Sequence, residues 1–138
     1  MTSRAEMSTL LKYCAVLFAI SLLSSCGLID SGVEWRGGPY SLVWIDNPDN
    51  IALCRDDGGT GCTGMVDAMV FAVGWDGHYA VAKQHPQGDR SKTNYYIIES
   101  RKAQKNDVIT GPLTEQEFMK KSREMGLPKF SKVLESLQ

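Results

Sequence analysis

The chain has 138 residues, of which 43% are hydrophobic, and its 15 basic side chains nearly balance 16 acidic ones. A net charge of −1 provides neither the positive surface that nucleic-acid binding needs nor a polybasic patch for membrane surfaces. The length disfavours a two-domain enzyme, and a single long apolar segment, residues 10–26, disfavours a multi-pass membrane protein.

The apolar run at residues 10–23 is too short to span a hydrocarbon core of about 30 Å comfortably, and small residues follow it directly. This pattern predicts a signal peptide over residues 1–25, which starts at Met1 or at Met7. The alternative is an uncleaved membrane anchor or a buried core helix.

The end of this segment, LSSCG at residues 23–27, resembles the lipobox of bacterial lipoproteins. The resemblance implies that Cys26 is lipidated and becomes the first residue of the mature chain. Because Gly27 rather than an aspartate follows it, the resemblance also implies anchoring at the periplasmic face of the outer membrane.

The remaining cysteines are Cys54 and Cys62, since one other leaves with the signal peptide and Cys26 is lipidated. In an oxidising compartment these two, which flank a short polar loop rich in glycine, are predicted to form a disulfide. The alternative is a metal site made by both thiols with His78 and His85. Zinc ligands usually come in close pairs, whereas these four residues are scattered.

Residues 26–39 are rich in glycine and show no periodicity, which is typical of a tether, so we expect a single domain over residues 40–138. Residues 40–46 alternate between apolar and polar and predict a strand, and residues 51–54 predict a second, shorter one. Between them, residues 46–50 read DNPDN, which is a dense turn signal.

The clearest element is a β-hairpin made of residues 66–75 and 78–84 around an Asp-Gly pair at positions 76–77. This pair suits a two-residue type I′ turn, which needs positive φ at both central positions. Such a turn predicts Trp75 opposite His78 and Gly74 opposite Tyr79, so that large side chains face small ones across the strands.

Two further strands are predicted over residues 94–99 and 107–110, and helices follow them. Thr114 and Glu117 have the spacing of a capping box, and Gly126 is typical of a left-handed C-cap. A second helix is predicted from four apolar residues at helical spacing, Phe130, Val133, Leu134 and Leu137. The predicted fold class is α+β, a small antiparallel β-meander of about five to six strands packed with C-terminal helices.

Residues able to carry catalysis are few. The two histidines each have an adequate structural interpretation, His78 beside a turn and His85 at a strand end. The motifs of serine hydrolases, zinc proteases and phosphate-binding loops are not found in the sequence. Four aspartates lack the EF-hand spacing for calcium and are explained by turns: Asp46, Asp49, Asp56 and Asp57. We therefore predict no catalytic residue, no metal and no cofactor.

The remaining functional signal is a surface suited to binding another protein. Asp56 and Asp57 lie in the loop that the predicted disulfide closes, and Trp75, Asp76 and His78 cluster at the hairpin end. Rigid loops with charged and aromatic side chains lose little entropy on association. These five residues are the candidate partner-binding set. The alternative is a solvated surface that only keeps the domain soluble.

The segment FAVGWDGHYAVAKQHP at residues 71–86, followed by NYYII at residues 94–98, resembles a signature of small bacterial lipoproteins. Some of these resemble immunity proteins encoded beside type VI secretion lipase effectors. The likeness also includes GPLTEQEF at residues 111–118 and GLP at residues 126–128. It implies a non-enzymatic immunity protein that binds a lipase (phospholipase) toxin in the periplasm.

Two other functions are compatible with the sequence. An envelope structural or ligand-sensing lipoprotein would bind an assembly partner or a small ligand, without a toxin. A small hydrolase would need His78 or His85 beside an acidic residue. We prefer the immunity protein to the envelope lipoprotein, and either of these to the hydrolase.

Overall fold

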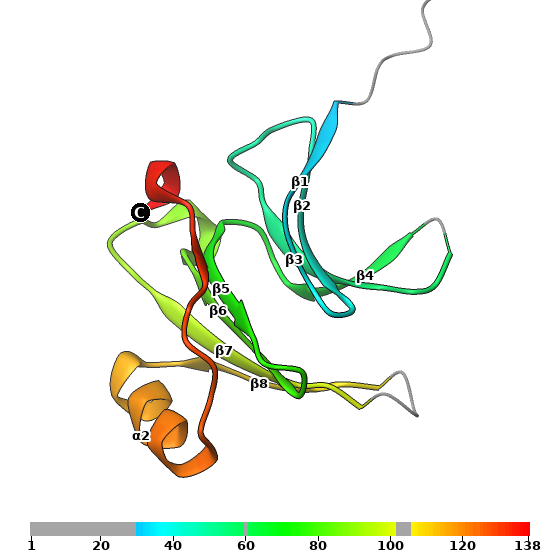
Figure 1. Ribbon diagram of the computed structural model, residues 1–138. Helices are drawn as coiled ribbons and strands as arrows, with labels where there is room; N and C mark the ends of the chain where they lie inside the picture. Colours follow the sequence, from blue (N-terminus) through cyan, green and yellow to red (C-terminus); the bar gives the residue numbers. More distant parts are fainter. Residues whose placement is uncertain (1–29, 60, 102–105) are drawn as a thin grey trace, which may run out of the picture.

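The computed structural model describes residues 30–59, 61–101 and 106–138, so the predicted signal peptide and Cys26 lie outside the described residues. Within those ranges the chain forms two antiparallel β-sheets and one α-helix (Figure 1). Sheet A has the strand order β1-β2-β3-β4, and sheet B has the order β8-β7-β6-β5-β9. The elements are β1 (Ser31–Gly37), β2 (Tyr40–Ile45), β3 (Ala52–Asp56), β4 (Cys62–Val66), β5 (Val70–Trp75), β6 (Tyr79–Gln84), the 3₁₀ turn η1 (Pro86–Gly88), β7 (Asn94–Glu99), β8 (Val108–Leu113), α2 (Glu115–Met125), β9 (Lys132–Val133) and the 3₁₀ turn η2 (Glu135–Leu137).

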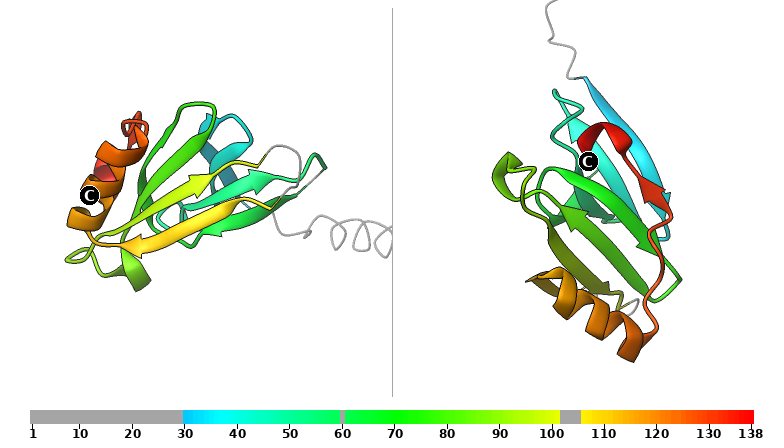
Figure 2. Two further views of the ribbon diagram at one scale, coloured as in Figure 1. Left: turned by 90° about the horizontal axis from the view of Figure 1, so that it is seen from below. Right: turned by 90° about the vertical axis from the view of Figure 1, so that its left-hand side faces the viewer.

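The two sheets and the helix form three layers, with the main core between the sheets (Figure 2). Leu42 and Leu53 from sheet A meet Val73 and Ile98 from sheet B there, and none of these four side chains is exposed. On the other face of sheet B, α2 buries Phe118. Sheet B is the middle layer, which explains why its central strands are apolar on both faces.

The structure confirms the antiparallel α+β prediction in part. It has more strands than predicted, in two sheets rather than one meander, and a single α-helix among the described residues. The chain passes from sheet A to sheet B at residues 67–69, where Met69 takes a left-handed conformation with φ of 71°. This reversal divides the apolar run at residues 66–75, which was predicted as one strand, between β4 and β5.

Residues 31–37 form β1, so the prediction of a tether over residues 26–39 is wrong for this part. β1 pairs with β2, and Gly32 lies opposite Trp44. A Cβ atom on Gly32 would be 2.6 Å from the indole ring, so the glycine makes room for an aromatic side chain. The glycines that indicated flexibility in the sequence therefore have a packing role, and the folded domain starts before residue 40.

β5 and β6 form the predicted hairpin, but their register is shifted by two residues. Trp75 lies opposite Ala80 instead of His78. The cause is the Asp76 carboxylate, whose Oδ1 accepts hydrogen bonds from the backbone amides of His78 (2.8 Å) and Tyr79 (2.7 Å). These bonds widen the loop. Because this shift is even, the side chains from Ala72 to Trp75 keep the face of the sheet that was predicted for them, whereas the register changes between Val70 and Ala72.

Gly74 lies opposite Val81 rather than Tyr79, and the backbone carbonyl of Lys129 occupies the space beside it. A Cβ atom on Gly74 would collide with that carbonyl, which cannot rotate away as a side chain can. We expect Gly74→Ala to lower the free energy of unfolding by about 2 kcal/mol, measured by urea unfolding. Gly64→Ala is the control, because its Cβ would meet no atom within 4 Å. Equal losses for both variants would contradict this explanation.

α2 begins and ends where the sequence predicts. The Thr114 side chain accepts a hydrogen bond from the Glu117 amide (3.3 Å), and the Glu117 carboxylate accepts one from the Thr114 amide (2.8 Å). This is the predicted capping box. Gly126 closes the helix in a left-handed conformation with φ of 65°.

The segment after α2 forms β9 and η2 instead of the predicted second helix. Its backbone pairs with the free edge of β5, where the Ser131 amide donates to the Val73 carbonyl (2.9 Å) and the Leu134 amide to the Phe71 carbonyl (2.7 Å). An open strand edge offers unpaired backbone groups that an extended segment can satisfy and a helix cannot. Leu137 is nevertheless buried. The apolar pattern therefore predicted the burial of this residue, although it lies in a 3₁₀ turn and not in the predicted helix.

Candidate functional site

The turns that follow β1, β3 and β5 and the residues after β7 lie at one end of the molecule, which we call the loop end (residues 38–39, 56–59, 76–78 and 100–101). Antiparallel hairpins place alternate turns at the same end of a sheet. The Asp56 amide donates to the Pro39 carbonyl (2.8 Å), and the Ser100 amide donates to the His78 carbonyl (2.9 Å). The turn between β1 and β2 packs on Trp75, which connects the loops of sheet A with those of sheet B.

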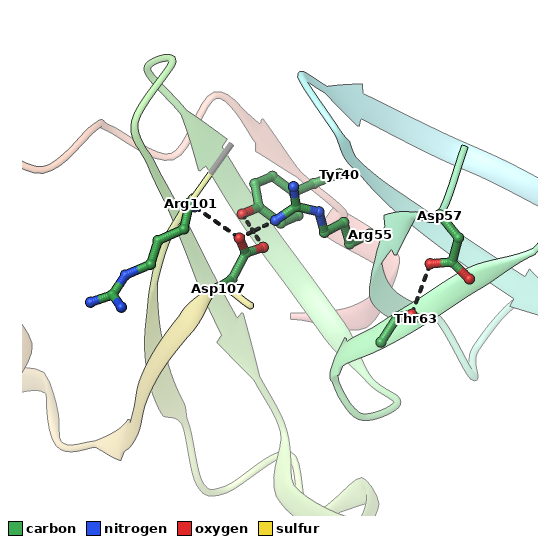
Figure 3. Close-up of polar contacts among 6 residues, drawn as sticks. All are labelled: Tyr40, Arg55, Asp57, Thr63, Arg101 and Asp107. Atoms are coloured by element: carbon green, nitrogen blue, oxygen red, sulfur yellow. Dashed lines mark hydrogen bonds and ion pairs between the residues drawn. The ribbon is translucent and has the colours of Figure 1, made fainter. Parts of the chain in front are cut away.

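A polar cluster, the Asp107 cluster (the side chains of Tyr40, Arg55 and Asp107 and the backbone amide of Arg101), joins the two sheets beneath the loop end (Figure 3). The Tyr40 hydroxyl donates to Asp107 Oδ2 (2.6 Å), and the Arg55 guanidinium forms an ion pair with Asp107 Oδ1. The backbone amide of Arg101 donates to the same oxygen (3.0 Å). The Asp107 side chain is 1% exposed and that of Arg55 12%. One carboxylate thus holds β2 and β3 of sheet A against the start of β8.

The electrostatics of the cluster favour an ionised Asp107 and a protonated Tyr40. Burial by itself raises the pKa of Asp107, but hydrogen bonds from Tyr40, the Arg101 amide and Arg55 outweigh it and hold that pKa below its usual value. Burial, and then the hydrogen bond to Asp107, raises the pKa of Tyr40 to about 12. The Tyr40 hydroxyl therefore remains a donor at neutral pH.

The lowered pKa of Asp107 predicts acid sensitivity. Its ionised form stabilises the fold fully above the unfolded-state pKa of about 3.9, and this contribution is lost as the pH falls through the lower folded-state pKa. We expect the free energy of unfolding to decrease below about pH 4, and the stability difference between wild type and Asp107→Asn to shrink there. Urea unfolding at a series of pH values measures both. A difference independent of pH would contradict the assignment.

The predicted disulfide between Cys54 and Cys62 is present and links β3 to β4. It closes the loop that carries Asp56 and Asp57, both of which are exposed. Asp57 Oδ1 accepts a hydrogen bond from the Thr63 hydroxyl (2.8 Å; Figure 3), and Asp56 Oδ1 accepts one from a loop amide (2.8 Å). Asp56 and Asp57 are therefore held beside the disulfide by hydrogen bonds to their own carboxylates.

The other predicted partner-binding residues lie at the β5–β6 turn and differ in exposure. Trp75 is half-buried and packs edge-to-face on Tyr40, with 5.2 Å between ring centroids. Its ring therefore packs against the core beneath the loop end. Asp76 is exposed and orders the turn. The His78 side chain is 58% exposed, and its Nε2 lies 3.8 Å from Glu99 Oε1. The exposed members of the predicted set thus lie on two ordered loops.

His85 is buried in the core at the opposite end of β6 from His78. Its ring stacks on Phe71 with 4.2 Å between centroids, and its Nδ1 lies 2.7 Å from the Lys92 carbonyl oxygen. These contacts give it a structural role. The metal site considered from two thiols and two histidines is contradicted, because the thiols are joined in the disulfide. Within the described ranges, no group of three or more histidine, cysteine, aspartate or glutamate residues could hold a metal ion.

Residues that the structure describes form two concave surfaces, and the first of them extends to Asp56 and Gly59 of the loop end. The first, of about 610 Å³, lies on the outer face of sheet A and includes Val33 and Ile45, which are 46% and 60% exposed. The second, of about 490 Å³, lies where the chain passes from sheet A to sheet B, at the end opposite the loop end. We call it the junction concavity, and its lining includes Asn50, Asp67 and Tyr96.

Sequence reasoning did not identify the Asp107 cluster. Arg55 and Asp107 are 52 positions apart, and Tyr40 and Asp107 are 67 apart. Arg55 lies in a polar loop-like stretch, and Asp107 follows a basic stretch, so each is explained locally as a solvated charge. The only signal available was that Asp107 is the first residue of a predicted strand, which says nothing about its partners.

Within the ranges that the structure describes, no helix has both the length and the apolar character needed to cross a membrane. Comparisons with curated proteins and with solved structures found no match. A protein-family model described as "Protein of unknown function (DUF3997)" matches residues 37–136. The match extends from the end of β1 into η2 and includes the disulfide and the whole Asp107 cluster. Because it covers most of the sequence, the chain belongs to this family.

Proposed function

We propose that this chain is a lipid-anchored immunity protein that faces the periplasm, and that it binds and neutralises a cognate type VI secretion lipase toxin. The observation that carries the proposal is the loop end: the Asp107 cluster joins the two sheets beneath it, and the disulfide closes its β3–β4 loop. A preformed surface of this kind loses little conformational entropy when a partner binds.

The chemistry of the loop end suits a protein partner. Asp56, Asp57 and Asp76 present carboxylates on two loops of the loop end, and His78 adds an exposed imidazole. Charged groups at the rim of an interface determine its specificity and its association rate more than its affinity. A partner with a complementary basic surface would therefore be selected by this end of the molecule.

To neutralise a toxin, an inhibitor needs only to bind it and does not need to catalyse a reaction. Binding at the lipase entrance would block substrate access, and binding elsewhere could hold the enzyme in an inactive conformation. The lipid anchor that the Cys26 resemblance implies would keep the inhibitor beside the membrane that a lipase attacks. The proposal thus explains three features at once: the expected location at the membrane, the preformed loop end and the sequence signature.

The decisive experiment is co-purification of the full chain with the lipase encoded beside its gene. We expect a stable complex, and we expect the chain to protect cells when that lipase is directed to the periplasm. A lipase that neither binds the chain nor is neutralised by it would overturn the proposal.

The double variant Asp57→Ala/His78→Ala tests the location of the interface. Because both side chains are exposed on ordered loops, we expect lipase binding to weaken at least about tenfold without a large change in melting temperature. The matched control is Lys120→Ala/Glu124→Ala, which changes two exposed charges on α2. If the two double variants bind the lipase equally well, the interface does not include the loop end.

An envelope lipoprotein that senses a ligand is the second candidate function. The junction concavity favours it, because a polar hollow between two sheets is suited to a small polar molecule. Binding of a small ligand, together with failure to bind any lipase, would support this alternative over the immunity protein.

A further inference from the structure

The junction concavity is formed by three connections that meet where sheet A passes into sheet B. They are the end of the β2–β3 loop, the β4–β5 link, and η1 after β6, and the start of β7 adds its first residues. The volume of about 490 Å³ lies within the range of small-molecule sites. Six of its lining residues carry polar side chains: Asn50, Asp67, Gln84, Gln87, Asn94 and Tyr96.

The Gln84 side chain holds parts of this concavity in place through hydrogen bonds. It is 5% exposed, and its Nε2 donates to the backbone carbonyls of Asp67 (3.1 Å) and Ala68 (3.3 Å). Its Oε1 accepts a hydrogen bond from the Tyr96 hydroxyl (3.1 Å). One buried amide therefore holds both the β4–β5 link and the Tyr96 hydroxyl, so these two parts of the lining are positioned before any ligand binds.

Two lining residues have an unusual backbone. Met69 (φ 71°) and Gln87 (φ 52°) are non-glycine residues in the left-handed region, and both line the concavity. Such conformations are disfavoured for residues with a Cβ and tend to occur at functional sites. They lie in two of the connections that form the concavity, which Asp67 also lines.

The lining groups define the kind of ligand. No lysine, arginine or histidine is among them, and Asp67 is the one ionisable acid, which disfavours an anion. Asn50, Gln87 and Asn94 provide amides, each of which both donates and accepts hydrogen bonds. A set of amides with one carboxylate matches sugar hydroxyls, which also donate and accept, and an aromatic ring offers an apolar surface for the C–H face of the sugar.

We propose that the junction concavity binds a neutral pyranose, either free or at the end of an oligosaccharide. Asp67 and the amides of Asn50 and Asn94 hydrogen-bond the hydroxyls, and the Tyr96 ring, held by Gln84, packs against the sugar ring. This binding activity is additional to the proposed lipase recognition and uses the opposite end of the molecule. The two can therefore be lost separately.

The test is saturation-transfer NMR and calorimetry on the full chain with methyl α-glucopyranoside, methyl α-galactopyranoside and methyl α-mannopyranoside. N,N′-Diacetylchitobiose represents an oligosaccharide end, and tetramethylammonium serves as a cationic comparison. We expect at least one sugar probe to bind with a dissociation constant on the order of 1 mM, as suits a small ligand in an open site. Tighter binding of a monosaccharide would indicate a free sugar as the ligand, and tighter binding of the disaccharide would indicate the end of an oligosaccharide.

Variants then locate the site. Asn94→Ala and Asp67→Ala are expected to weaken sugar binding at least about fivefold. Asn50→Ala, whose side chain is exposed, provides a third variant if either of the others fails to fold. Gln116→Ala is the matched control, because it removes an exposed amide from α2 and should leave the affinity unchanged.

Three outcomes would overturn the proposal. They are no binding of any sugar probe up to about 20 mM, equal binding by the concavity variants and the Gln116→Ala control, and binding of tetramethylammonium in place of the sugars. Lipase binding by Asn94→Ala is expected to stay at the wild-type value. Failure of the sugar site is therefore distinguishable from failure of the proposed immunity function.

Discussion

Replacing Asp107 by alanine is expected to lower the free energy of unfolding by about 3–5 kcal/mol, because it removes one partner of a buried ion pair. The Arg55 charge would lose its counterion, and the Tyr40 hydroxyl and the Arg101 amide would lose their acceptor. Leaving buried donors and a buried charge unsatisfied costs more than the hydrogen bonds themselves stabilise. Urea unfolding followed by tryptophan fluorescence measures the loss.

Asp49→Ala is the matched control, since Asp49 is an exposed aspartate in the turn after β2. We expect it to change stability by no more than about 0.5 kcal/mol. The double variant Arg55→Met/Asp107→Leu should recover part of the loss, because an apolar pair leaves no unpaired charge. A loss below about 1 kcal/mol for Asp107→Ala would contradict the view that this cluster holds the two sheets together.

Removing the disulfide with Cys54→Ala/Cys62→Ala is expected to destabilise the fold by about 2.5 kcal/mol. The bond closes a loop between cysteines 8 positions apart, and the chain-entropy model gives this magnitude for so short a loop. The loss is expected to include the order of the β3–β4 loop, which carries Asp56 and Asp57. Guanidinium unfolding of the oxidised wild type and of the variant measures the difference.

The same proteins under reducing conditions provide the control. Dithiothreitol should lower the stability of the wild type to about that of the double variant and should not affect the variant. If the lipase interface lies at the loop end, reduction should also weaken the complex. An unchanged wild-type stability after complete reduction, verified by thiol counting, would contradict a stabilising role for the bond.

The local elements of this fold are largely determined by the sequence. The capping box of Thr114 and Glu117 and the left-handed Gly126 define α2 by contacts within a few residues. The disulfide is predictable because Cys54 and Cys62 flank one short loop. The alternation along β2 identifies the face that carries Tyr40 and Leu42 into the core, since the period of a strand is fixed by its backbone.

The predictions that failed did so where a distant partner decides the conformation. Residues 31–37 look flexible until Trp44 fills the space above Gly32, and residues 132–133 look helical until the open edge of β5 accepts their backbone. The β5–β6 register depends on which amides the Asp76 carboxylate accepts from. In each case the local pattern is compatible with two structures, and packing selects one of them.

The sequence by itself determined which residues are apolar enough for the core, which short loop is closed by the disulfide, and where the helix starts and ends. Only the tertiary structure decided that the strands divide into two sheets, that Asp107 joins them through Tyr40 and Arg55, and that Gln84 braces a polar hollow at their junction. The reason is physical. Periodicity and capping are encoded within one turn or strand, whereas a buried charge or amide gains its partners only when segments more than ten residues apart come together.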